Sequence, residues 1–62
     1  MSVQDLYRVI LDGEELEIKT ENGICLWYGK NEDMPKEYFD KIVDTIYSFE
    51  GSNETYIVIT IA

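Results

Sequence analysis

Residues 35–50 read PKEYFDKIVDTIYSFE and form the longest segment of this 62-residue chain with a helical period. At about 100° per residue, the apolar side chains fall within half of a helical circle, and the charged ones fill the opposite arc. Pro35 suits the first turn of a helix, and Gly51 suits the position just after its last turn. The pattern therefore predicts a helix over about residues 35–50, with its apolar side formed by Tyr38, Phe39, Ile42, Val43, Ile46, Tyr47 and Phe49.

Three segments rich in strand-forming residues precede this helix, over about residues 5–11, 15–20 and 24–29. The first two are separated by Asp12-Gly13, which is typical of a two-residue hairpin turn. The predicted result is an antiparallel meander of three strands.

The turn between the second and third strands leaves two alternatives open. Gly23 suits a three-residue turn with a bulge, which places Tyr28 in the core and Trp27 on the outer face of the sheet. A two-residue Asn22-Gly23 turn reverses the faces and turns Trp27 inward. We expect the first arrangement, because it places two aliphatic residues and a tyrosine inside.

The β-branched run at residues 55–61, TYIVITI, predicts a final strand. A right-handed crossover would return it to the sheet parallel to the strand at residues 5–11 and beside it. The predicted fold class is α+β, a small two-layer β-β-β-α-β domain over residues 1–62 in which one helix packs on one face of the sheet. A chain of this length has room for only one core.

Composition excludes several classes of function. Asp and Glu number 13 against 5 Lys and Arg, a formal charge of −8 that disfavours direct binding to nucleic acid or to an anionic membrane. Without histidine, Cys25 and the serines lack the usual catalytic base. A lone cysteine also forms no internal disulfide and no ordinary zinc site. We expect no enzyme activity, no cofactor and no metal. With no signal peptide or membrane span, the expected compartment is the cytoplasm, or the host cytoplasm if a phage encodes the chain.

Acidic residues recur along one side of the predicted helix at steps of four, three and four: Asp33, Glu37, Asp40 and Asp44. Such a row could imitate a nucleic-acid backbone, although its charges are several-fold sparser than those of B-DNA. The alternative interpretation is an ordinary solvated helix face.

The outer face of the predicted sheet is a second candidate surface. It combines a tryptophan with aliphatic residues and a charged rim, the composition of a contact patch. Its expected partner-binding residues are Leu6, Ile10, Trp27, Tyr56 and Val58, with Glu15 and Glu17 at the rim.

The sequence thus predicts a small acidic, non-enzymatic protein-binding module that docks on a larger basic protein. By size and charge it looks like the inhibitors that phages direct against host nucleic-acid enzymes, which would make it a nucleic-acid mimic. The alternative is a structural homodimer assembled through the C-terminal strand and the outer sheet face.

Overall fold

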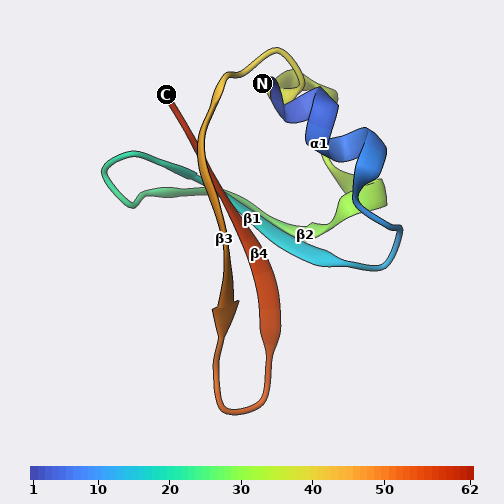
Figure 1. Ribbon diagram of the computed structural model, residues 1–62, viewed down its shortest axis with the longest axis vertical. Coiled ribbons are helices and arrows are strands. Elements are labelled where there is room, and N and C mark those ends of the chain that lie inside the picture. Colours follow the sequence, from blue (N-terminus) through green and yellow to red (C-terminus); the bar gives the residue numbers. More distant parts are fainter.

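The computed structural model describes residues 1–62 and contains one α-helix and a four-stranded mixed sheet, so the α+β class is confirmed (Figure 1). In chain order the elements are α1 (Val3–Val9), β1 (Glu15–Thr20), β2 (Cys25–Lys30), the 3-10 helices η1 (Asn31–Asp33) and η2 (Lys36–Tyr38), β3 (Val43–Glu50) and β4 (Thr55–Ile61). The strands lie in the order β2-β1-β4-β3. β1 and β4 are parallel, and the two outer pairs are antiparallel. None of the helices is long and apolar enough to cross a bilayer.

The predicted strand at residues 5–11 is wrong, because most of that segment belongs to α1. Ser2 and Asp5 form a capping box in which each side chain accepts a hydrogen bond from the other residue's backbone N–H, at 3.4 Å and 2.9 Å. This satisfies two of the donors that a helix start leaves free. Gly13 does adopt a turn conformation, with φ of +89°, but its turn joins a helix to a strand.

The predicted helix at residues 35–50 is also wrong. Residues 36–38 form only the single turn of η2, and residues 43–50 form β3, which pairs antiparallel with β4 from Val43↔Ile61 to Glu50↔Thr55. Val, Thr, Ile, Tyr and Phe fill most of β3, and these residues favour strands. The β-branched run of β4 thereby gains a hydrogen-bonded neighbour on each side.

The predicted strand order is wrong as well. The final strand does run parallel to an earlier one, but that strand is β1 rather than the segment at residues 5–11. β4 lies between β1 and β3, so both of its edges are paired.

The faces of β2 are the reverse of those expected. The expected register holds at Lys19↔Cys25, but an irregularity then brings Trp27 opposite Ile18 and leaves Leu26 as an extra residue. Side chains alternate between faces, so this one insertion turns Trp27 toward the core. The indole lies over Gly29, where a Cβ atom would be only 2.7 Å from the ring carbon Cζ2. Glycine therefore makes the inward position of Trp27 possible.

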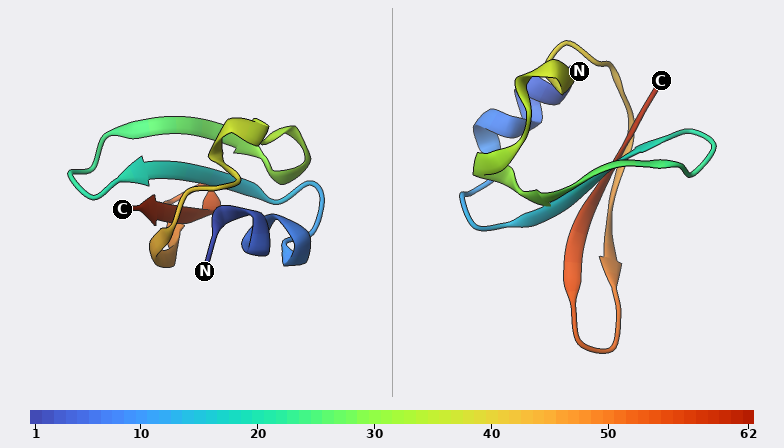
Figure 2. Two further views of the ribbon diagram at one scale, coloured as in Figure 1. Left: turned by 90° about the horizontal axis from the view of Figure 1, so that it is seen from above. Right: turned by 180° about the vertical axis from the view of Figure 1, so that it is seen from behind.

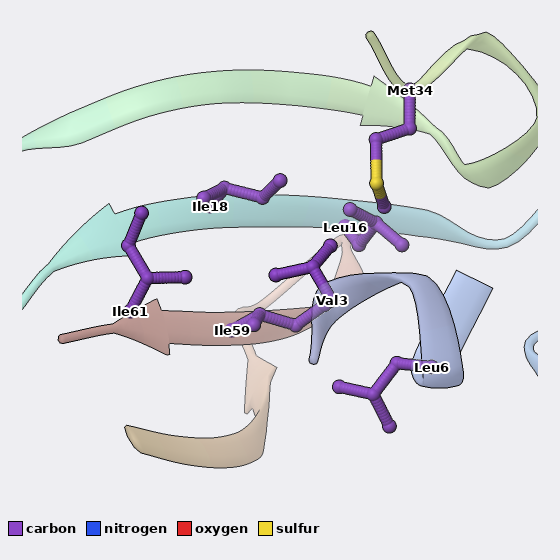
Figure 3. Packing of buried hydrophobic residues seen from close by; sticks show 7 residues of the cluster. All are labelled: Val3, Leu6, Leu16, Ile18, Met34, Ile59 and Ile61. Carbon is purple, nitrogen blue, oxygen red and sulfur yellow. The ribbon is translucent and has the colours of Figure 1, made fainter. Parts of the chain in front are cut away.

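The core lies between α1 and one face of the sheet (Figure 3). It consists of Val3, Leu6, Leu16, Ile18, Met34, Ile59 and Ile61. The helix and the segment with η1 and η2 lie at one end of the sheet, whereas the β3–β4 hairpin projects away from them (Figures 1 and 2). β3 and the tip of that hairpin are consequently exposed, whereas Val58, Ile59 and Ile61 of β4 are buried.

Candidate binding face on the sheet

The sheet face opposite α1 carries no helix or loop and is called the open face below. Residues directly opposite each other on paired strands share a face, so the register identifies its members. Glu17 of β1 lies opposite Tyr28 of β2 and Val58 of β4, and Phe49 of β3 lies opposite Tyr56. The open face also includes Glu15, Lys19, Cys25, Lys30, Tyr47 and Thr60.

Three aromatic rings from three strands form a continuous row across this face. The Tyr28 and Tyr56 rings meet edge to face at 5.3 Å, and the Tyr56 and Phe49 rings stack at 4.9 Å. Tyr28 and Phe49 remain 45% and 44% exposed, although each packs on Tyr56. The row, defined as Tyr28, Tyr56 and Phe49, thus presents apolar surface that is held in place but not covered.

Carboxylates lie beside and beneath the aromatic row. Because β1 lies between β2 and β4, the Tyr28 and Tyr56 rings meet across it, and Glu17 on β1 is only 8% exposed. The Lys19 Nζ lies 3.7 Å from the Glu17 Oε1. The Tyr28 hydroxyl donates a hydrogen bond to the Glu15 Oε2 at 2.6 Å. The open face therefore combines aromatic rings with two carboxylates, Glu15 and Glu17, and with two lysines, Lys19 and Lys30.

Hydrogen bonding, desolvation and nearby carboxylates raise the pKa values of the two tyrosines of the row. The hydrogen bond to Glu15, with smaller contributions from desolvation and from Glu15 and Glu54 charge, raises the pKa of Tyr28 from 10.0 to about 12. The pKa of Tyr56 is raised first by desolvation and then by the charges of Glu17 and Glu54. Both shifts have the sign expected where a nearby carboxylate disfavours a phenolate.

We expect the Tyr28 phenol to titrate with a pKa of about 12 and to move back toward 10.0 in Glu15→Ala, because the substitution removes both the acceptor and its charge. The raised folded-state pKa stabilises the fold fully below the unfolded value of about 10. That contribution decreases as the pH rises from 10 to 12. Ultraviolet titration against a Tyr28→Phe reference isolates this phenol. A pKa near 10 in the unmodified chain would contradict the Tyr28–Glu15 contact.

Cys25 is exposed at the start of β2, on the same face as Glu17. Hydrogen bonding to the Glu17 carboxylate, followed by desolvation, raises the pKa of the Cys25 thiol. The thiol is therefore held in its protonated, weakly nucleophilic form.

The residues expected at a contact surface fall into two groups. Tyr56, Val58, Glu15 and Glu17 lie together on the open face, but Val58 and Glu17 are buried beneath their neighbours, at 1% and 8% exposure. The other three lie on the opposite side: Leu6 is a buried residue of α1, and Ile10 and Trp27 pack against the core. Leu6 and Ile10 were expected on the outer face because of a strand that does not form, and Trp27 because of a register that does not form.

The four acidic residues of the expected helical row do not share a helix. Asp33 ends η1, Glu37 lies in η2, Asp40 follows it, and Asp44 lies where the β3–β4 register shifts. The expected steps of four, three and four therefore have no structural meaning here.

Sequence reasoning missed Tyr28, Tyr47 and Phe49 as members of the open face. Tyr28 lies there because of the extra residue at Leu26, which no sequence pattern marks, although the alternative Asn22-Gly23 turn would have placed it on the same face. The other two could have been found from the alternation of Thr45, Tyr47 and Phe49, which has the period of a strand.

Elsewhere, Thr20, Glu21, Asn22, Ile61 and Ala62 line a shallow hollow of about 260 Å³ that is wide open to solvent. This volume lies below the range of about 300–1,000 Å³ for small-molecule pockets. No three His, Cys, Asp or Glu side chains are grouped so that they could hold a metal ion. Comparisons with known proteins find no matching family, no similar curated protein and no similar solved structure.

Proposed function

We propose that this chain is a non-enzymatic protein-binding module that takes up a basic segment of a larger protein on the open face of its sheet. The observation that carries the proposal is the aromatic row, in which Tyr28 and Phe49 are half-exposed and the rings lie beside Glu15 and over Glu17. Lys and Arg cations bind the faces of aromatic rings, and nearby carboxylates strengthen that attraction.

The distribution of charge supports a basic partner. The chain has a formal charge of −8, and residues 43–61 contain Asp44, Glu50 and Glu54 but no Lys or Arg. The end of the open face formed by the β3–β4 hairpin therefore has no cation of its own. Long-range attraction would speed the encounter with a basic protein, and the packed rings would supply most of the affinity.

The proposal does not include nucleic-acid mimicry, because the acidic row that suggested it depended on a helix that is absent. It also does not include a homodimer assembled through the final strand, because β4 has no free edge. Two copies of a chain with charge −8 would in addition repel each other.

Phe49→Ala is expected to weaken binding of a Lys- and Arg-rich peptide by roughly 2- to 5-fold, through loss of one ring of the row. The measurement is an NMR titration of the labelled chain, in which the largest shifts should fall on Tyr28, Tyr56 and Phe49. Ile24→Ala removes a comparably exposed aliphatic side chain at the β1–β2 tip and should leave the affinity unchanged.

A pair of charge reversals separates local from overall electrostatics. Glu54→Lys changes the charge beside the row, whereas Glu37→Lys makes the same change in η2. We expect the first to weaken binding more than the second. Equal effects of the two reversals, or shifts spread evenly over the molecule, would show that the open face is not the binding site.

A further inference from the structure

The outer edge of β3 has unpaired backbone groups over residues 46–50. The Gly51 N–H donates to the Glu54 carbonyl, and the Ala62 N–H donates to the Ile42 carbonyl. These bonds flank the pairs Glu50↔Thr55 and Val43↔Ile61, which are therefore non-hydrogen-bonded pairs of the β3–β4 ladder. Because bonded and non-bonded pairs alternate along an antiparallel ladder, the N–H and C=O groups of Ile46, Ser48 and Glu50 point away from β4. They face no other strand, since β3 lies at the edge of the sheet.

The same edge already accepts a strand-like segment where β3 begins. Ser2 forms an antiparallel bridge with Ile42, in which the Val43 N–H donates to the Met1 carbonyl at 2.8 Å. The Val3 N–H donates to the Lys41 carbonyl at 2.9 Å. Residues 1–3 thus occupy the start of a fifth-strand position, beside residues 41–43.

The central part of this edge, between the register shift at Asp44 and the charged Glu50, lacks the features that usually prevent strand addition. Residues 45–49, TIYSF, contain no proline and no charged residue. Ile46, Tyr47 and Phe49 are 47%, 48% and 44% exposed. An exposed edge with apolar side chains on both faces is a template for another strand.

The charges identify the strand that this template fits. Residues 43–61 carry three carboxylates and no cation, so an added strand with Lys or Arg is attracted, whereas a second acidic copy is repelled. Residues opposite Tyr47 and Phe49 would lie on the open face beside the aromatic row, and those opposite Ile46 and Ser48 on the other face. Cations are favoured at the positions opposite Tyr47 and Phe49, and apolar side chains at the positions opposite Ile46 and Ser48.

We propose that the partner's basic segment binds as a fifth strand, antiparallel to β3 along residues 46–50, with Lys or Arg at alternate positions. This inference rests on the proposed function, which requires only that a basic segment bind the open face. Main-chain hydrogen bonds supply affinity in this mode, and alternate side chains supply specificity.

The test uses a capped peptide in which Lys and Val alternate over seven positions. In the proposed arrangement the Val residues lie opposite Ile46, Ser48 and Glu50, so their N–H groups face β3. N-methylation of every Val is expected to weaken binding at least roughly ten-fold, because each methyl group removes a donor and blocks close approach. N-methylation of the Lys residues instead alters the solvent edge and should change affinity little.

Amide exchange provides a second readout on the unmodified chain. The peptide should slow exchange at Ile46, Ser48 and Glu50 more than at Tyr47 and Phe49, whose N–H groups already bond β4. Equal binding of both methylated peptides, with no selective slowing, would overturn strand addition but leave binding to the open face intact. No binding of the unmethylated peptide would overturn both proposals.

Discussion

Ile59→Ala is expected to destabilise the fold by about 2–5 kcal/mol, because truncating a fully buried isoleucine loses its transfer free energy and leaves a cavity. Ile59 is 0% exposed and lies opposite Ile18 on one side and Ile46 on the other. At about 0.05–0.15 kcal/mol per residue, a chain of this size has a free energy of unfolding of only about 3–9 kcal/mol. The variant should therefore be largely unfolded or close to it, which urea titration followed by circular dichroism would measure.

Ile46→Ala is the matched control, because it makes the same chemical change on the neighbouring strand and the same face. Ile46 is 47% exposed, so its truncation should cost under about 1.5 kcal/mol. In a helix over residues 35–50, by contrast, Ile46 would belong to the buried side. Equal destabilisation by the two substitutions would thus contradict the placement of β3 at an open edge.

The central part of the sheet could be predicted from the sequence. Residues 15–20 and 55–61 form β1 and β4 at the expected bounds, and the third strand is displaced by one residue. β4 alternates regularly, and this placed Tyr56 and Val58 together on the outer face. Regular alternation identifies faces well when no bulge intervenes.

The two wrong elements have different physical causes. The segment at residues 5–11 has the side chains of a strand, but its first residue, Asp5, forms a capping box with Ser2 upstream and the chain starts a helix instead. The β3 segment is exposed on both faces and carries apolar residues on both, so its strand alternation is weak and the same residues also fit a helical spacing. Pairing with β4 then overrides the helical pattern.

The aromatic row could be predicted only in part, because it depends on contacts between distant segments. Tyr28, Tyr56 and Phe49 come from three strands, and β1 separates two of them. One extra residue at Leu26 exchanges Tyr28 for Trp27 on the open face. A single-residue irregularity therefore decides which aromatic side chain lies on the open face.

Asn31→Asp is expected to destabilise the fold by about 3–5 kcal/mol at neutral pH, because it places a buried carboxylate against two carbonyl oxygens. Asn31 is 1% exposed, and its Nδ2 donates to the carbonyls of Tyr7 and Ile10 at 3.1 Å and 2.9 Å. These carbonyls lie at the end of α1, so the side chain joins the helix to the end of β2. Urea titration at neutral and mildly acidic pH would measure the loss.

The pH dependence distinguishes a buried charge from a lost hydrogen bond. Burial raises the pKa of an aspartate, so the substituted chain should bind a proton more readily when folded than when unfolded. Its stability relative to the unmodified chain should then increase as the pH falls toward the unfolded-state pKa of about 3.9. Asn31→Ser loses donors without adding charge, and its cost of about 1–3 kcal/mol should not change with pH. If the aspartate and serine variants were equally stable at every pH, Asn31 could not be enclosed between α1 and β2, and the packing of the helix on the sheet would have to differ.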